Sequence, residues 1–206
     1  IEAAGERDLV VIHDAKRGDI GISAEHYAHG MFRRVDGIAP SWVTVNPVFG
    51  SDGIIPFLER GGVFAIVRTS NPSSDLFQSL PMEYGETLAE AVAELIAGIG
   101  RSEDAFIGRH GYSRLGAVVA ATKPEDCDCL RSRMPEQIFL MPGYGAQGGA
   151  VEGIRRCFDG KGRGAVVPAS RSVIYAFEPD DESWLNAVRD AASRFADDVG
   201  QAADLR

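Results

Sequence analysis

Short apolar runs recur six times along the chain, and each is followed by a polar or glycine-rich turn and then by a helical segment. The runs fall at residues 9–12, 41–47, 63–67, 115–121, 138–141 and 164–167. Short apolar strands that alternate with helices are typical of parallel sheets with right-handed crossovers. The pattern predicts an α/β fold of six β/α units, either an open sheet or a barrel short of two strands.

Three helical segments carry clear signals. Thr87 and Glu90 fit a capping box in front of a helical stripe. Ser23 is expected to cap the helix after the first strand, and Asp52 the short helix after the second. The stripes expected to face the sheet are Tyr27, Ala28, Met31, Phe32 and Val35; Leu88, Val92, Leu95, Ile96 and Ile99; and Trp184, Val188, Ala191, Phe195 and Val199.

Composition narrows the class of partner and the compartment. We expect one domain over residues 1–206, and the net charge of -9 argues against nucleic acid or an anionic membrane. No apolar run approaches the roughly 18 residues that a membrane span needs. Cys127, Cys129 and Cys157 are odd in number and form no CxxC pair, which favours a reduced, cytoplasmic setting. Cys127 and Cys129 are expected to be ordinary thiols in a surface loop.

The first apolar run, expected to be a buried strand, ends in Asp14-Ala15-Lys16-Arg17-Gly18-Asp19. Side chains alternate along a strand, so Asp14 and Lys16 should lie on one face. Charges at the end of an apolar strand are costly unless they pair with one another or with a ligand. Carboxylates beside Lys16 favour its ammonium form, which can protonate a carbon centre that has become negative. A purely structural salt-bridge cluster is the alternative.

A second set of residues follows the last two strands. The turn over residues 142–149 is rich in glycine and contains Pro142 and Gln147, and Arg171 lies between Ser170 and Ser172. Glycines let backbone N–H groups approach an anion, and an arginine can hold phosphate with two donors. The pattern predicts a phosphate site, with a plain glycine turn as the alternative. His26 and His29 lack an evident third ligand, so no metal site is expected.

Together, these motifs resemble the orotidine 5′-monophosphate decarboxylase family in its longer bacterial branch (type 2). Residues 14–20 match the DxKxxD signature of that family. The remaining motifs follow in the order of that branch: Thr44-Val45-Asn46-Pro47 with Gly50-Ser51-Asp52, Thr69-Ser70-Asn71-Pro72, Leu115-Gly116-Ala117-Val118-Val119 and the turn over residues 142–149. The resemblance covers nearly the whole chain.

The resemblance implies a TIM-type (β/α)8 barrel, of which six units are present, and a homodimer with shared active sites. It implies conversion of orotidine 5′-monophosphate to uridine 5′-monophosphate and carbon dioxide in pyrimidine biosynthesis, without a metal or organic cofactor. Carried over by motif, the roles are a proton donor to C6 (Lys16), a carboxylate that crowds that of the substrate (Asp14), contacts in the neighbouring subunit's site (Asp19, Ser23), a pyrimidine-edge contact (Ser70), a base contact (Pro142) and phosphate ligands (Gln147, Arg171).

The sequence differs from the family pattern at its N-terminus. The family has two further strands before the one with this motif, ending in an aspartate and a lysine. We expect them upstream of Ile1 or in a separate chain, with a degraded copy of the family as the third explanation. Six strands alone should leave an open, aggregation-prone edge. Two other functions stay open: a magnesium-dependent sugar-phosphate decarboxylase or aldol-type synthase of the same superfamily, and a non-catalytic nucleotide-binding remnant.

Overall fold

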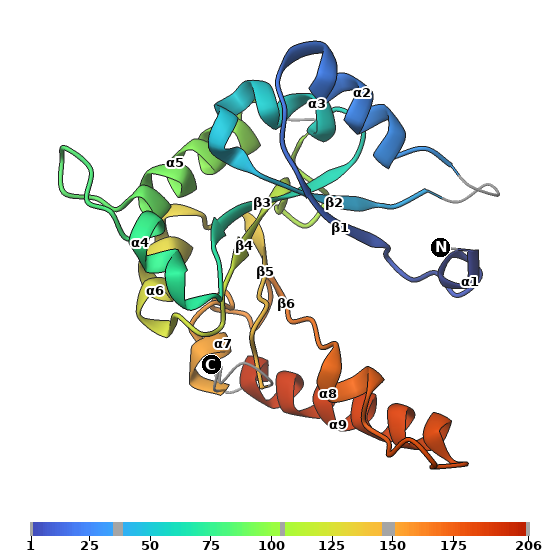
Figure 1. The fold of residues 1–206 in the computed structure, drawn as a ribbon. Helices are drawn as coiled ribbons and strands as arrows, with labels where there is room; N and C mark the ends of the chain where they lie inside the picture. The colour runs from blue at the N-terminus through green and yellow to red at the C-terminus, as the bar shows by residue number, and fades with distance from the viewer. Residues whose placement is uncertain (1, 35–38, 104–105, 146–150, 205–206) are drawn as a thin grey trace.

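One six-stranded parallel sheet forms the centre of the chain, and its strands lie side by side in sequence order (Figure 1). The computed structural model describes residues 2–34, 39–103, 106–145 and 151–204. The strands are β1 (Ile12–Arg17), β2 (Trp42–Val45), β3 (Gly62–Arg68), β4 (Ser113–Val119), β5 (Gln137–Leu140) and β6 (Ala165–Val166). The parallel pairing and the six repeats predicted from the sequence are confirmed.

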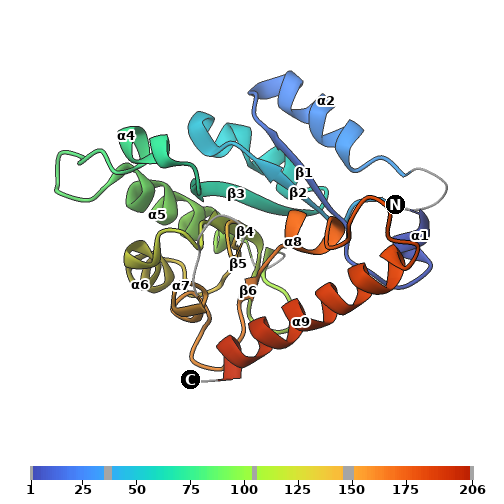
Figure 2. The same ribbon diagram turned by 60° about the horizontal axis from the view of Figure 1, so that its bottom comes forward.

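Helical segments connect the strands, and Figure 1 shows α2, α3, α5, α6 and α7 one after another around the outside of the curved sheet. The helices are α1 (Glu2–Gly5), α2 (Gly21–Met31), η1 (Pro47–Gly53), α3 (Ile55–Leu58), η2 (Pro72–Ser74), α4 (Asp75–Gln78), α5 (Leu88–Gly100), α6 (Pro124–Arg133), α7 (Val151–Arg155), α8 (Arg171–Ile174) and α9 (Trp184–Asp204). The long α9 packs against α7 and α8 (Figure 2).

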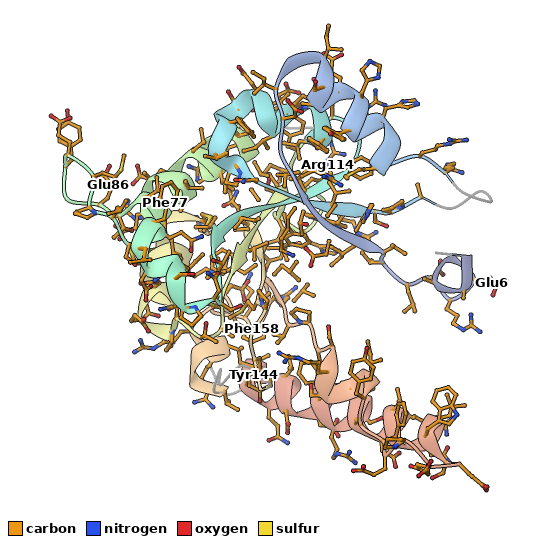
Figure 3. The ribbon with its side chains drawn as sticks, viewed as in Figure 1. Glu6, Phe77, Glu86, Arg114, Tyr144 and Phe158 are labelled. Atoms are coloured by element: carbon orange, nitrogen blue, oxygen red, sulfur yellow. A yellow bond between two sulfur atoms is a disulfide. The ribbon has the colours of Figure 1, made fainter. Side chains whose placement is uncertain are left out.

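The two faces of the sheet carry two apolar clusters, because successive residues of a strand point to opposite sides. On the helical side, alternate residues of β2 to β5 join the buried side chains of α2, α5 and α6 in one large cluster. On the other face, Phe64, Val118 and Leu140 form a smaller cluster. Phe158 is buried in the large cluster, whereas Phe77 on α4 is exposed (Figure 3). The larger core thus holds the helices on one side of the sheet.

The helix that follows the long loop after β3 begins as predicted. The Thr87 side chain accepts from the backbone N–H of Glu90, and the Glu90 carboxylate accepts from the backbone N–H of Thr87, which is a complete capping box. Ile96 and Ile99 are buried against the sheet. The start of α5 therefore matches the sequence pattern, but its buried face differs: Leu95, expected to face the sheet, is 37% exposed, and the alanines Ala89, Ala93 and Ala97 are buried beside the two isoleucines.

Three predictions near the start of the chain are wrong. Leu9 and Val10 are 60% and 66% exposed, and β1 begins only at Ile12, so the strand carries the charged motif instead of preceding it. Ser23 does not cap α2, because the helix already begins at Gly21, whose φ of +53° favours glycine. Tyr27 is exposed, since α2 buries Ala24 and Ala28 instead.

The prediction for Asp52 is also wrong. Asp52 lies inside η1, and within the described chain its carboxylate accepts only a long hydrogen bond, of 3.4 Å, from the Ser51 hydroxyl. Asn46 takes the capping role, because its side chain accepts from the backbone N–H of Val48 at 3.1 Å. Asn46 therefore shapes the turn after β2.

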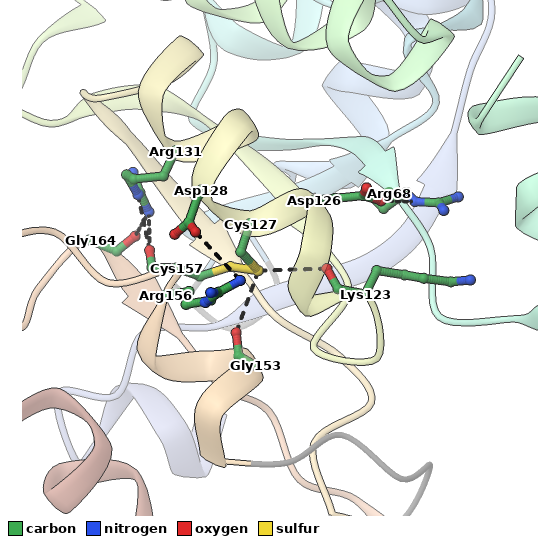
Figure 4. The surroundings of a disulfide bond; sticks show 10 residues. All are labelled: Arg68, Lys123, Asp126, Cys127, Asp128, Arg131, Gly153, Arg156, Cys157 and Gly164. Carbon is green, nitrogen blue, oxygen red and sulfur yellow. Dashed lines mark hydrogen bonds and ion pairs between the residues drawn. A yellow bond between two sulfur atoms is a disulfide. The ribbon is translucent and has the colours of Figure 1, made fainter. Parts of the chain in front are cut away.

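The cysteines differ most from expectation. Cys127 lies in α6, is fully buried and forms a disulfide with Cys157 (Figure 4). Cys129 also lies in α6, where its thiol donates to Glu90. Neither residue is in a surface loop, and only Cys129 is a free thiol. The disulfide removes the argument for a reduced compartment that rested on cysteine count.

Candidate active site

The charged pair at the end of β1 is held by a threonine from the neighbouring strand. The Lys16 ammonium lies 2.5 Å from the Asp14 carboxylate, and the Thr44 hydroxyl donates to the same carboxylate oxygen at 2.9 Å. The Thr44 hydroxyl also accepts from the backbone N–H of Lys16 at 2.8 Å. The side chains of Lys16 and Asp14 remain 51% and 59% exposed. The pair is therefore fixed at its base and open to a ligand at its tip.

The backbone at Lys16 is unusual. Its φ of +49° lies in the left-handed region, which a lysine occupies only at a cost of about 1–3 kcal/mol. The pairing of β1 with β2 is irregular between His13 and Arg17 at the same place. Because of this bend, the Lys16 N–H meets a side chain, Thr44, instead of a strand carbonyl. Local strain of this kind, held in place by a neighbouring strand, is common at functional sites.

The environment of Asp14 stabilises its charged form. Partial burial acts to raise the pKa of Asp14, but hydrogen bonds from Lys16 and Thr44 and the positive charge of Lys16 outweigh it and lower the pKa below the ordinary value. Asp14 therefore stays ionised at neutral pH, and a second carboxylate placed beside it would be repelled.

The carboxyl ends of β3, β4 and β5 are joined through three consecutive residues after β4. The backbone N–H of Ala120 donates to the backbone carbonyl of Arg68 at 2.9 Å, and the backbone N–H of Ala121 donates to the carbonyl of Pro142 at 2.9 Å. The Thr122 hydroxyl reaches the carbonyl of Ser70 at 3.5 Å. Ser70 and Pro142, predicted to contact the base, thus follow strands β3 and β5, and both are hydrogen-bonded to the segment after β4. They lie at the carboxyl edge of the sheet, as Lys16 does.

The predicted phosphate region lies between the turn after β5 and α8. A cavity of about 410 Å³ is lined there by Tyr144, Gly145, Ser172 and Arg194 together with apolar residues of α9. Arg171 begins α8 and is exposed. Gln147 lies outside the described residues. The structure therefore brings Ser172 to this cavity and leaves Arg171 beside it, at the solvent.

Asp19 and Ser23 do not join the pair on β1. The Asp19 carboxylate accepts from the backbone N–H of Ile20 at 2.8 Å, and Ser23 is exposed on the first turn of α2. A second cavity, of about 470 Å³, lies between η1, α4 and α5 and is lined in part by Asn46, but not by Lys16 or Asp14. Asp14 and Lys16 are thus the two predicted catalytic residues that the structure brings into contact.

Thr44 is the site residue that the sequence analysis missed. It is fully buried, yet its hydroxyl bonds to both members of the charged pair. The signal was a single hydroxyl in the apolar run Trp42-Val43-Thr44-Val45. This run is the strand that follows the charged motif in the sequence, and Thr44 lies near its carboxyl end. Within the described ranges, no group of three or more His, Cys, Asp or Glu is arranged to hold a metal ion. The helices described there include none with the length and apolar character of a membrane span.

Comparison with known proteins agrees with this geometry. Residues 1–183 match the model of the orotidine 5′-phosphate decarboxylase / HUMPS family. The chain belongs to this family. An orotidine 5′-phosphate decarboxylase from Rhodopirellula baltica is 38% identical over 207 residues, which cover 93% of this chain and 67% of the relative. A relative of the same name from Caldicellulosiruptor bescii is 39% identical over 189 residues, covering 86% of this chain and 61% of the relative.

Solved structures of the family share the fold. A putative orotidine-monophosphate-decarboxylase from Toxoplasma gondii superposes with a TM-score of 0.83 at 30% identity, covering 95% of this chain and 68% of that chain. The six parallel strands are thus part of the family's β/α barrel. The chain spans 61% to 67% of the length of the two relatives named above.

Proposed function

We propose that the chain acts in the decarboxylation of orotidine 5′-monophosphate to uridine 5′-monophosphate, as a carboxy-lyase of pyrimidine biosynthesis. The observation that carries the proposal is the Lys16–Asp14 pair at 2.5 Å, held by Thr44 at the carboxyl end of β1. The relatives that match over most of this chain bear the name of this activity. The exposed tip of the pair leaves room for a substrate.

The proposed chemistry needs one bond to break and one to form. The bond between C6 of the pyrimidine and its carboxylate breaks, carbon dioxide leaves, and the electron pair remains on C6. The Lys16 ammonium then gives its proton to C6 and later regains one from solvent. Asp14, kept ionised by Lys16 and Thr44, repels the substrate carboxylate, and this repulsion is relieved when carbon dioxide departs.

Substrate binding is proposed for residues that follow β3, β5 and β6 in the sequence. Ser70 would contact the pyrimidine edge, Pro142 would line the base, and Arg171 with Gln147 would bind the phosphate. Phosphate binding far from the reacting carbon can lower the barrier if it closes loops around the site. No metal or organic cofactor is part of this proposal.

Asp19 and Ser23 fit a shared site. Both lie outside contact with the Lys16–Asp14 pair of their own chain, and Ser23 is exposed on α2. We propose a homodimer in the cytoplasm in which these two residues reach the site of the partner subunit.

The test is release of labelled carbon dioxide from carboxyl-labelled orotidine 5′-monophosphate. We expect Lys16→Ala to lower turnover about 10³-fold, the size of a lost general acid, while the far-ultraviolet circular dichroism stays unchanged. Lys161→Ala is the matched control, because Lys161 is exposed and its hydrogen bond within the described chain is made by its backbone N–H, which donates to Asp159. Undiminished turnover in Lys16→Ala would remove Lys16 from the mechanism.

Two outcomes would point to another function. Loss of activity on addition of a chelator would favour the magnesium-dependent sugar-phosphate chemistry. Binding of uridine 5′-monophosphate without turnover would identify a nucleotide-binding remnant. If the chain neither binds uridine 5′-monophosphate nor turns over orotidine 5′-monophosphate, the proposal is refuted.

A further inference from the structure

Arg68, the last residue of β3, is the one charged residue that is buried in the described part of the chain. Its side chain is 3% exposed, and its guanidinium donates to carboxylates of two different elements. One is Asp126 at the start of α6, at 2.6 Å, and the other is Asp75 at the start of α4. Lys123 donates to Asp75 as well, at 2.7 Å. These four residues, the Arg68 cluster, hold two positive and two negative charges.

The guanidinium also holds the chain on both sides of Asp75. It donates to the hydroxyls of Ser74 at 3.2 Å and Ser79 at 3.0 Å. An arginine presents five N–H donors in a planar fork, so one side chain can satisfy several acceptors at fixed angles. A buried charge of this kind adds little to stability compared with apolar packing, and its clearest effect is to select one arrangement of the groups around it.

The segment held in this way is the one that carries Ser70. Gln78, which follows Asp75 on α4, accepts from the backbone N–H of Thr69 at 2.9 Å. On the other side, Thr69 and Asn71 are joined through their side chains at 2.7 Å, and Thr122 reaches the Ser70 carbonyl. The backbone of Ser70 is therefore held on both sides. Its hydroxyl has no hydrogen-bond partner among the described residues, and the side chain is half-buried.

We propose that Arg68 is a positioning residue that holds the Ser70 hydroxyl in place for the pyrimidine edge of the nucleotide. The proposal rests on the function proposed above, since it needs a nucleotide at this end of the sheet. Arg68 does not touch the substrate. It acts by tying the segment after β3 to Asp126 at the start of α6. Thr122, which precedes α6 by two residues, donates from its hydroxyl to the Ser70 carbonyl oxygen.

The test is a double-mutant cycle of Arg68→Lys and Ser70→Ala. A lysine keeps the charge but cannot reproduce the fork. We expect each single variant to raise KM for orotidine 5′-monophosphate, and Kd for uridine 5′-monophosphate, about tenfold, the effect of one lost hydrogen bond. The kcat should stay within about twofold, because the contact is made equally in ground and transition states. The double variant should bind no more weakly than Ser70→Ala alone.

Arg131→Lys is the matched control. Arg131 also makes several hydrogen bonds, but to the carbonyls of Cys157, Gln137 and Gly164, at the opposite end of the strands. We expect this variant to lower Tm and to leave KM and Kd unchanged. A similar rise in Kd for Arg131→Lys, or effects of Arg68→Lys and Ser70→Ala that multiply, would overturn the proposal.

Hydrogen exchange separates this proposal from the proposed function. Arg68→Lys should speed amide exchange in residues 69–79 and leave the capped helix α5 unchanged, whether or not the protein turns over substrate. Unchanged exchange in that segment would refute the positioning role on its own. Absence of turnover with intact binding of uridine 5′-monophosphate would refute only the decarboxylase activity.

Discussion

The disulfide between Cys127 and Cys157 should contribute several kcal/mol to stability. It closes a loop of 30 residues that runs from α6 through β5 to Cys157, two residues beyond the end of α7 (Figure 4). In the chain-entropy model, a loop of this length lowers the entropy of the unfolded chain by about 12 cal/mol/K, which is about 3.6 kcal/mol at 25 °C. We therefore expect the free energy of unfolding to fall by about this amount when both cysteines are replaced by alanine.

The assay is urea unfolding of the oxidised protein and of the Cys127→Ala/Cys157→Ala variant. Trp42, which stacks on Phe64 with ring centroids 4.6 Å apart, reports on the sheet by fluorescence. With a slope of about 2 kcal/mol per molar urea, the midpoint should fall by about 1.8 M. Cys129→Ala in both proteins removes the free thiol that could exchange with the disulfide.

Reductant gives the internal control. It should lower the midpoint of the protein with the disulfide and leave that of the double alanine variant unchanged. Equal midpoints for the two proteins, once thiol counting has shown that the disulfide was present, would refute the loop-closure argument. Three reactive thiols in the denatured, unreduced wild-type protein would refute the disulfide itself.

Three further outcomes are expected. The hydrogen bonds from Lys123 and then Arg68 lower the pKa of Asp75 from 3.8 to about 2, so its contribution to stability is complete above pH 3.8 and is lost as the pH falls to about 2. The urea midpoint of Asp75→Asn should therefore depend less on pH over this range than that of the wild-type protein. An equal pH dependence of the two midpoints would contradict the assignment. Thr87→Ala should cost about 1 kcal/mol in urea unfolding because it removes half of the capping box at α5, and a change near zero would show that the cap is not stabilising. Equal mixtures of Lys16→Ala and Asp19→Ala subunits should recover about a quarter of wild-type turnover if Asp19 serves the partner's site, since half of the dimers would then hold one intact site; no recovery after confirmed subunit exchange would contradict a shared site.

Local patterns predicted much of the fold. Glu90 lies three residues after Thr87, so the capping box depends on neighbours within one turn and could be recognised directly. The six apolar runs likewise predicted six parallel strands, because each strand pairs with the next one in the sequence. The family motifs came from residues close together in the chain. Features that depend on a few consecutive residues could therefore be predicted from the sequence.

The errors concern features set by tertiary packing. The Leu9 and Val10 side chains are apolar but exposed, because the ladder with β2 begins only at Ile12. Cys127 and Cys157 are 30 residues apart, and no spacing rule joins them before α6 and α7 pack together. The role of Thr44 depends on the register of β2 against β1, which the sequence pattern did not specify. The Arg68 cluster likewise joins a carboxylate seven residues further on, Asp75, to one that is 58 residues away, Asp126.

The sequential order of the strands makes the sheet a one-dimensional array of similar units. In such an array each strand depends on its immediate neighbours for its backbone hydrogen bonds. Within the described sheet, β1 and β6 each have one neighbouring strand, whereas β3 and β4 lie at its centre. Lys16 is on an end strand and Ser70 follows a central one. The proposed proton donor is therefore held by one neighbouring strand, through Thr44 of β2, whereas the segment with the proposed base contact follows a strand that is paired on both sides.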